Sequence, residues 1–404
     1  MERIFLPGDI LVPQGISMEK WSVIACDQFT SQPEYWQEVR DRVGDSPSAL
    51  NLIMPEAFLN DIPALDVAQR TAEAMDDYLN RGLFRVLKDS FVCVERQVAG
   101  GFVRRGVVGC VDLEKYDFTP GSDAPIRASE RTVAERLPAR MLIRRGASLE
   151  LPHVIVLIND REDPVIRPLW RELKDETPIY DFDLMAGGGH IRGWQVSGPR
   201  AQALAEQFAA LPGGLKMVVG DGNHSLAAAK ELWNRLRMDL TEEERENHPA
   251  RFALCEAESV WDEGVIFHPI HRVIFGAEPR ILLETMEKKL QVEGGRQVKI
   301  VSGGRIAGTL SVRGKSFGTM VDALQDVLEE HENDYDAMVD YVHDSAAAIA
   351  MTARDENTLA FLMPTVKKED LFDTVLRDGV FPKKSFSIGT ARDKRYYLEC
   401  RKIR

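Results

Sequence analysis

The feature that most constrains the fold of this chain is the alternation of strand-like and helix-like segments along its whole length. Apolar runs such as 91–97 and 215–219 indicate buried strands, whereas 67–80 and 226–237 place apolar residues at helical spacing. Such an alternation predicts a mixed α/β (α+β) fold rather than an all-helical or all-strand one.

Further segments fill in this pattern. Strands are also predicted at 21–26, 102–111, 153–158 and 252–258, and helices at 32–43 and 241–247. After Phe275 the pattern changes to a helix, two strands, a helix and a strand, which indicates a smaller α+β lobe inserted in the C-terminal half. The predicted domains are a main body over 1–278, the lobe over 279–360, and a segment over 361–404 that returns to the main body.

Charge and cysteine content exclude several classes of protein. The formal net charge is −13, so a nucleic-acid partner is disfavoured, because such binders gather positive charge against phosphates. The five cysteines are widely spaced with no C-x-x-C, which argues against a disulfide framework and a cysteine-rich zinc site. No apolar run reaches the ~18 residues that a membrane span requires, and the N-terminus does not resemble a secretory signal. We therefore expect a cytoplasmic protein.

The sharpest local signal is a strand that ends in Gly220-Asp221-Gly222-Asn223-His224-Ser225 and is followed by a helix. Glycines allow a tight turn, and the first N–H groups of the helix, together with its dipole, favour an anion. Asn223, His224 and Ser225 can add side-chain donors, and Asp221 can orient one of them or hold Mg²⁺. The alternative is an ordinary glycine turn with a polar cap on the next helix.

This loop differs from two well-known sequence patterns. It is neither a Walker A loop nor a G-x-G-x-x-G loop. Ser225 also lacks the G-x-S-x-G context of a nucleophilic serine, so the sequence does not predict it as a nucleophile.

A second signal is a run of arginines inside an acidic chain. The run consists of Arg127, Arg131, Arg136, Arg140, Arg144 and Arg145. Only Glu130 and Glu135 oppose it, and on a helix three of the arginines, spaced four apart around Arg140, share one face. Guanidinium groups bind phosphates and carboxylates bidentately, so we expect Arg140 to face the same cleft as 221–225. A solvated helix face is the alternative.

Three further clusters carry polar side chains. Asp27 and Gln28 end the first predicted strand, where Asp27 can act as a base or simply as a cap. His268 and His271 lie three apart around Pro269, with no further metal ligand nearby. Lys383 and Lys384 stand beside small residues in the C-terminal tail and can clamp an anion, or form a charged terminal strand.

The loop and four other patches together resemble a known family. The strand–DGxH–helix pattern is similar to the ParB/sulfiredoxin superfamily, and within it to domain-of-unknown-function family 1015. The corresponding patches in this chain are 26–28, 150–153 (ELPH), 221–225 (DGNHS), 269–272 (PIHR) and 382–389 (PKKSFSIG). Asn223 and Ser225 depart from the family's usual DGHHR, and no cysteine lies in the loop, so the sulfiredoxin reaction is not expected.

The resemblance implies a ParB/sulfiredoxin-like core, ATP or ADP as the nucleotide, and Mg²⁺. It implies that Asp27, Asp221 and His224 serve catalysis. The residues expected to hold nucleotide phosphates are Gly222, Asn223, His224, Ser225, Arg140, Lys383 and Lys384. Those expected to contact a small-molecule substrate are Gln28, Glu130, His271 and Arg272.

The favoured function is a nucleotide-dependent phosphotransferase acting on a small metabolite, with free L-serine as the best single acceptor, in either direction of reaction. Phosphoryl transfer chiefly requires positioning and charge stabilisation, which these residues can supply. The alternatives are a ParB-like nucleotide-binding regulatory protein without kinase activity, and an acidic structural protein whose loop is only a turn. Assembly into a homo-oligomer is left open.

Overall fold

The computed structural model describes residues 3–58 and 61–404, and its contacts divide the chain into two compact units. Unit 1 comprises Met1–Ala128, Thr132–Val265 and Gly389–Arg404, and unit 2 comprises Ser129–Arg131 and Ile266–Ile388. Unit 2 is closed at its two ends by the antiparallel pairing of β14 (Phe267–Pro269) with β20 (Phe386–Ile388). The limits expected at 279 and 361 both lie inside this unit.

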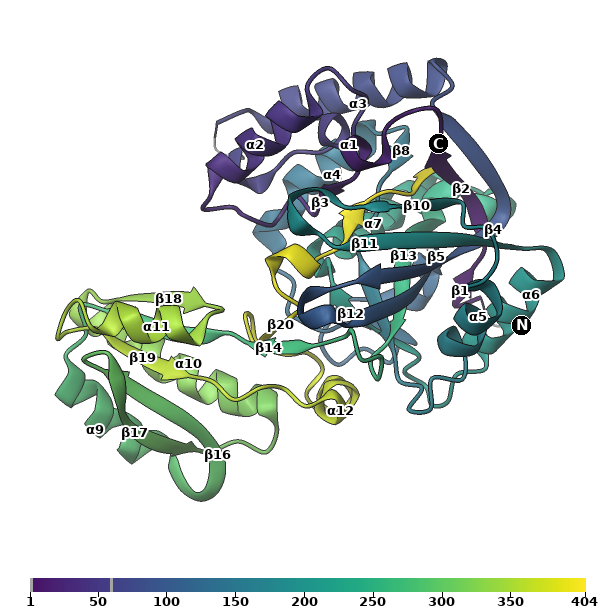
Figure 1. The fold of residues 1–404 in the computed structure, drawn as a ribbon. Helices are drawn as coiled ribbons and strands as arrows, with labels where there is room; N and C mark the ends of the chain where they lie inside the picture. The colour runs from purple at the N-terminus through teal and green to yellow at the C-terminus, as the bar shows by residue number, and fades with distance from the viewer. Residues whose placement is uncertain (1–2, 59–60) are drawn as a thin grey trace. The chain divides into compact units, whose positions relative to one another are not determined.

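A large mixed sheet organises unit 1 (Figure 1). Its main path runs β6 (Tyr116–Asp117), β7 (Ile126–Ala128), β12 (Met217–Asp221), β9 (Ile155–Ile158), β13 (Phe252–Ser259), β5 (Val103–Asp112), β4 (Phe84–Gln97), β2 (Gly8–Pro13), β22 (Cys400–Lys402) and β8 (Leu149–Glu150). Off this path, β1 (Phe5–Leu6) pairs with β5, and β10 (Tyr180–Asp183) pairs with β11 (His190–Ser197), which pairs with β4. The contacts of β12 with β7 and of β13 with β9 are parallel, whereas β12 and β9 are antiparallel, so the expected mixed α/β class is confirmed.

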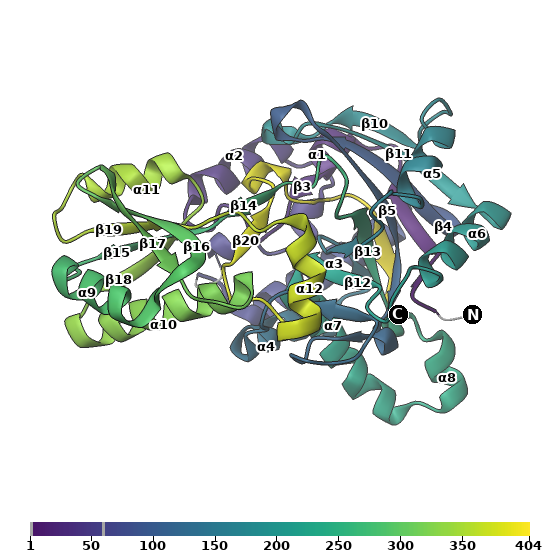
Figure 2. The same cartoon turned by 90° about the horizontal axis from the view of Figure 1, so that it is seen from below.

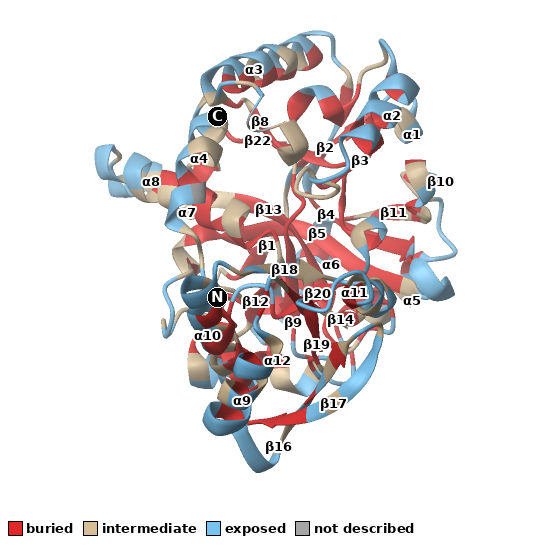
Figure 3. Ribbon diagram, turned by 90° about the vertical axis from the view of Figure 1, so that its left-hand side faces the viewer, coloured by how far each residue is buried: buried red, intermediate tan, exposed pale blue. Residues whose placement is uncertain are grey.

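Both faces of this sheet are covered, and β4 shows why. Val92 and Val94 contribute to one hydrophobic cluster, while Phe91 and Cys93 contribute to the other, as the alternation of side chains along a strand requires. The first cluster contains Trp21 and the second contains Phe208, so residues 90–96 of β4 are buried on both faces, whereas its first half reaches solvent (Figure 3).

The helices of unit 1 fall on these two faces according to their apolar residues. The first face receives α2 (Pro33–Val43) and α3 (Ala64–Asn80), and the second receives α5 (Ile166–Leu173), α6 (Gly198–Ala209) and α7 (Asn223–Leu236). Two further helices are α4 (Leu137–Gly146), which contacts both α3 and α7, and the short α8 (Glu242–Asn247). None of the helices in the described ranges combines the length and apolar character that a membrane crossing requires.

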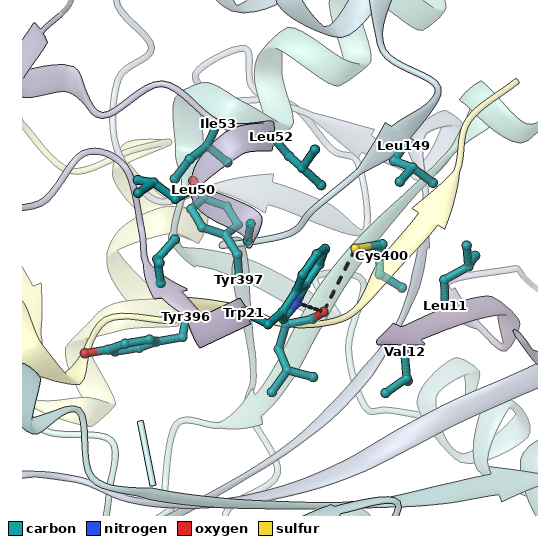
Figure 4. Packing of buried hydrophobic residues seen from close by; sticks show 14 of the residues in the cluster. Leu11, Val12, Trp21, Leu50, Leu52, Ile53, Leu149, Tyr396, Tyr397 and Cys400 are labelled. Atoms are coloured by element: carbon teal, nitrogen blue, oxygen red, sulfur yellow. Dashed lines mark hydrogen bonds between the residues drawn. The ribbon is translucent and has the colours of Figure 1, made fainter. Parts of the chain in front are cut away.

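The first predicted strand, 21–26, is wrong in its extent. Only Val23–Ile24 form a strand, β3, because Ser17 caps a preceding helical turn, α1 (Met18–Trp21). The indole Nε1 of Trp21 donates to the carbonyl of Leu398 at 2.9 Å (Figure 4), and β3 pairs with β21 (Tyr396–Tyr397). The C-terminal segment therefore lies directly beside this N-terminal strand.

Unit 2 is built on an antiparallel sheet of its own. The strand order is β17 (Arg305–Val312), β16 (Gln291–Ser302), β19 (Leu359–Leu362), β15 (His271–Phe275) and β18 (Met338–Val342). Figure 2 shows α11 (Ser345–Thr352) on one side of this sheet, with α9 (Pro279–Leu290) and α10 (Phe317–Tyr335) on the other. Val273 and Ala360 pack with Ala348 of α11, so this unit has a hydrophobic core of its own. The last helix of the unit is α12 (Lys368–Asp378).

Candidate functional site

The candidate site of unit 1 starts at the turn between β12 and α7. Gly222 adopts a positive φ of 78°, in which non-glycine residues are strained. A Cβ at this position would also lie 2.9 Å from Cγ2 of Val154 and 3.0 Å from its Cα. The turn places Asp221, Asn223, His224 and Ser225 at the N-terminus of a helix of 14 residues, where the helix dipole favours negative charge.

The carboxylate of Asp221 is held from two directions. Its Oδ1 accepts a hydrogen bond from the backbone N–H of Gly222 at 2.8 Å, and its Oδ2 lies 3.2 Å from Nζ of Lys394. Lys394 comes from the C-terminal segment and is buried. The loop therefore carries a balanced pair of charges at its base.

The two residues that open α7 differ in their surroundings. Asn223 is buried, whereas His224 is partly exposed. The backbone N–H of Val133 donates to Nε2 of His224 at 3.2 Å. In this contact Nε2 of His224 is the acceptor, so a neutral ring carries its hydrogen on Nδ1.

Ser225 takes part in a chain of polar contacts that the sequence did not predict. Its Oγ lies 3.1 Å from Nε2 of His153, and Nδ1 of the same imidazole lies 3.0 Å from the hydroxyl of Tyr397. The backbone N–H of Cys26 donates to that hydroxyl at 3.2 Å. His153 stands in the ELPH patch, which is the one sequence signal that pointed to it; no local pattern pointed to Tyr397.

A cavity of about 180 Å³ lies beside this chain of contacts. Its polar lining includes Arg140, His153, Ser225 and Tyr397, and the rest is largely aliphatic, contributed by leucine, isoleucine and alanine side chains. Arg140 and Ser225 therefore border the same cavity, although they are far apart in sequence. Figure 4 shows Tyr397 among buried apolar neighbours that include Leu50 and Ile53.

Arg140 and Arg144 lie on α4, and each is ion-paired. Arg140 contacts the carboxylate of Glu56, and Arg144 lies 2.5 Å from Glu150. Pro138 stands in the first turn of α4, where proline is well tolerated, so the helix begins at Leu137.

The predicted arginine stripe is thus divided among several elements. Arg127 lies in β7, is buried, and donates from Nε to the carbonyl of Ala124 at 2.8 Å. Arg131 belongs to unit 2, and Arg136 precedes α4 in a short 3-10 helix. Arg140, Arg144 and Arg145 remain together on α4.

Asp27 and Gln28 follow β3 and are partly buried. The amide Nε2 of Gln28 donates to Oδ1 of Asp27 at 3.0 Å. Burial acts to raise the pKa of Asp27, but the imidazole of His153, the bond from Gln28 and the ammonium group of Lys394 outweigh it and lower the pKa below its ordinary value. Asp27 is therefore an ionised carboxylate within the electrostatic reach of His153 and Lys394.

The remaining predicted residues lie in unit 2. Arg272 is fully buried, donates to the carbonyl of Ile270 at 2.5 Å and lies over the ring of Tyr341, and burial lowers its pKa to about 10. His271 is also buried, and its Nδ1 accepts from the backbone N–H of Met363 at 3.1 Å. The negative charges of Tyr341 and Glu130 partly oppose this lowering of the Arg272 pKa.

Lys383 and Lys384 have a different environment within the same unit. They are exposed in the turn between α12 and β20, where Lys384 has a φ of 57°. The structure thus gathers Asp27, Gln28, Arg140 and the 221–225 loop in unit 1, whereas Glu130, His271, Arg272, Lys383 and Lys384 belong to unit 2.

Comparison with known families identifies the chain. Residues 11–378 match the family described as "Protein of unknown function (DUF1015)", and the chain belongs to this family. A search of curated proteins finds no significant match.

Solved structures give more distant likenesses. A free serine kinase in complex with AMP is 12% identical with a TM-score of 0.41, covering 73% of this chain and 91% of that one. A conserved hypothetical protein from Pyrococcus furiosus is 13% identical with a TM-score of 0.36, covering 72% and 90%. C-terminally truncated SbnI from Staphylococcus aureus is 8% identical with a TM-score of 0.36, covering 70% and 82%.

Proposed function

We propose that this protein is a nucleotide-dependent phosphotransferase that acts on a hydroxyl group of a small metabolite. The observation that carries the proposal is the β12–Gly222–α7 turn, which places Ser225 at the N-terminus of α7. Ser225 and Arg140 border the same cavity of unit 1. A helix N-terminus approached through glycine attracts phosphate, and a guanidinium group can stabilise the transferred charge. The ParB/sulfiredoxin-like core implied by the sequence patches belongs to the same proposal.

The ionisable groups fit such a reaction. Asp27 is ionised, so its carboxylate can accept a hydrogen bond from an acceptor hydroxyl and orient it. Lys394 is paired with Asp221 and holds that carboxylate in place beside the loop. Free L-serine is the acceptor to test first, because the superfamily that the loop resembles includes kinases of free serine.

Mg²⁺ fits this site as a companion of the nucleotide. Across the described ranges, no group of three or more His, Cys, Asp or Glu side chains could hold a metal ion. Mg²⁺ commonly needs only one or two protein carboxylates in addition to phosphates, and Asp221 offers one. When bound, Mg²⁺ would neutralise charge on the phosphate groups.

The test combines a binding measurement with an assay of the product. Calorimetry with ATP and ADP in the presence of Mg²⁺ should give saturable binding, and mass spectrometry should detect phosphoserine after incubation with L-serine. Arg140→Ala should weaken nucleotide affinity by roughly 10–150-fold, the equivalent of a charge-assisted hydrogen bond of about 1.5–3 kcal/mol. Arg140→Lys should restore part of the affinity, because lysine keeps the charge without the planar fork.

Arg145→Ala is the matched control for this test. Arg145 lies on the same helix but is exposed and does not border the cavity, so its loss should leave affinity unchanged. If both variants lost the same affinity for nucleotide, Arg140 would act only through long-range charge and not through direct contact. If Arg140→Ala bound nucleotide as the wild type does, Arg140 would not belong to the nucleotide site. Nucleotide binding without any phosphorylated product would instead favour the regulatory alternative.

A further inference from the structure

Ser225 has the surroundings of an activated nucleophile. Its Oγ lies 3.1 Å from Nε2 of His153, and the imidazole is held on its other side by Tyr397 at 3.0 Å. We propose that Ser225 is a covalent phosphoryl acceptor for which His153 is the general base, an inference that rests on the proposed phosphotransferase function. The chain lacks a G-x-S-x-G motif, but a serine–base pair is defined by geometry rather than by a motif.

Two features of the fold favour this role for Ser225. It lies in the first turn of α7, where the helix dipole stabilises a developing alkoxide and an incoming phosphate. It is also partly exposed and borders the cavity, so a substrate atom can reach its Oγ.

Cys26 borders the same cavity but is a poorer candidate. Burial, together with the neighbouring charge of Asp27, raises the pKa of the Cys26 thiol to about 12. Thiols react as thiolates, so Cys26 stays inert at neutral pH. Ser225, with a base in hydrogen-bonding contact, is the reactive group of this cavity.

The imidazole can serve as a base only in one tautomer. His153 must carry its hydrogen on Nδ1 and donate it to the oxygen of Tyr397, which leaves Nε2 to accept the proton of Ser225. The ionised carboxylate of Asp27 then favours the imidazolium that forms, because the two groups interact electrostatically. Tyr397 is thus a positioning residue, and His153 is the group that takes the proton.

The proposed reaction balances in two steps. In the first, Ser225 Oγ attacks the terminal phosphorus of a nucleoside triphosphate, the bond to the bridging oxygen breaks, the nucleoside diphosphate leaves, and the serine proton moves to His153 Nε2. In the second, the acceptor hydroxyl attacks the phosphoserine and loses its proton to solvent. The Ser225–phosphorus bond breaks, and His153 returns its proton to Ser225 Oγ.

A fluorophosphonate probe tests the nucleophile without any nucleotide. Attack by Ser225 would form an oxygen–phosphorus bond and expel fluoride, and peptide mass spectrometry would locate the adduct. The wild-type protein should be labelled at Ser225 and Ser225→Ala should not. His153→Gln should slow labelling by roughly 100-fold or more, as expected for the loss of a general base.

Tyr397→Phe keeps the proposal testable if His153→Gln does not fold. This variant retains the imidazole and removes the partner of Nδ1, so the rate of the covalent step should fall while the affinity for the probe stays the same. If Tyr397 had a purely structural role, its loss would lower the rate of the covalent step and the affinity for the probe together. Absence of label at Ser225, or equal rates in wild type and both variants, would overturn the inference.

Incubation with ATP labelled at the γ-phosphate separates this inference from the proposed function. With Mg²⁺ and no acceptor, the wild type should carry label on Ser225, and L-serine should then remove it. If ATP binds and product forms while Ser225→Ala turns over at the wild-type rate, the covalent step is wrong and the phosphotransferase proposal stands. If ATP does not bind, the proposed function fails and the phosphoryl acceptor role of Ser225 fails with it.

Discussion

Gly222 meets two separate requirements at one position. Its φ of 78° lies in the left-handed region, and the space where a Cβ would stand is already taken by Val154. The first requirement concerns the backbone and the second concerns packing. Together they keep the N-terminus of α7 close to the strand that precedes it.

Gly222→Ala should therefore be more destabilising than a glycine-to-alanine change at a position that has a positive φ but free space for a Cβ. Gly213→Ala is the matched control, because Gly213 has a φ of 76° but nothing within 4 Å of its virtual Cβ. Both variants bear the strain of about 1–3 kcal/mol, and Gly222→Ala should lose about 1–3 kcal/mol more through overpacking. Urea unfolding monitored by tryptophan fluorescence measures the difference, and equal losses would contradict the packing argument.

The residues of the site differ in how far the sequence could predict them. The 221–225 loop is local, so its glycines and polar residues identify it without any tertiary information. His153 stands 72 residues before Ser225, and Tyr397 stands 244 residues after His153. The pairing of β12 with β9 and of β22 with β8, together with the bond from Arg395 to the carbonyl of Pro152, brings these side chains together, and no local pattern encodes those contacts.

At the level of elements, the well-predicted segments are those with clear periodicity and boundaries. For α2, proline in the first turn and Gly44 after the last explain why the predicted and observed helices agree. The short strands β2, β8 and β22 were missed, because two to six residues leave too little alternation to detect. Their pairing depends on the C-terminal segment reaching the N-terminal one, which is a tertiary contact.

The hairpin of β10 and β11 contains a pH-sensitive contact. His190 lies between two carboxylates, with Nδ1 at 2.6 Å from Asp183 and Nε2 at 2.7 Å from Asp181. The bond to Asp183, helped by Asp181 and opposed by partial burial, raises the pKa of His190 above its ordinary value of 6.5. A raised pKa in the folded state means that protonation stabilises the hairpin.

We expect this stabilisation to be complete below about pH 6.5 and to be lost as the pH rises through the folded-state pKa of His190. The pair is largely exposed, so the effect should not exceed about 1 kcal/mol. A titration of the His190 ring by NMR should give a midpoint above 6.5, and the hydrogen-exchange protection factors of 180–197, in which the intrinsic pH dependence of exchange is divided out, should fall at higher pH. His190→Gln should abolish this pH dependence of the protection factors; a midpoint at or below 6.5 would contradict the geometry.

At the scale of the whole molecule, the chain leaves unit 1 to form unit 2 and returns at Gly389. The returning segment brings Lys394 to Asp221, Tyr397 to His153 and Arg401 to Glu150. Sequence reasoning predicted a returning C-terminal segment but not these contacts, since each depends on how the whole chain is threaded. The candidate site therefore combines the C-terminal segment with residues from the central part of unit 1.

Arg395 is the ion-pairing centre of this returning segment. Its guanidinium is 4% exposed and lies 2.7 Å from both Glu256 and Glu399, and it also donates to the carbonyl of Pro152 at 2.5 Å. Removing one partner from a buried ion pair leaves uncompensated charge, which typically costs about 3–5 kcal/mol. Arg395→Met should therefore destabilise unit 1 strongly, although methionine fills much of the same space.

Tryptophan fluorescence can measure this effect in unit 1 alone, because all six tryptophans lie in that unit. The control is Arg235→Met, which breaks an exposed ion pair with Glu231. The two residues are four apart, as are Arg395 and Glu399. This control should change the free energy of unfolding by less than about 0.5 kcal/mol. Loss of the returning segment should also remove Lys394 and Tyr397 from the site, so Arg395→Met should bind nucleotide weakly even where it remains folded. If Arg395→Met proved as stable as the control, apolar contacts such as those of Leu398 would be sufficient to hold the segment in place. The buried ion pairs would then fix the geometry of the site without contributing to the stability of unit 1.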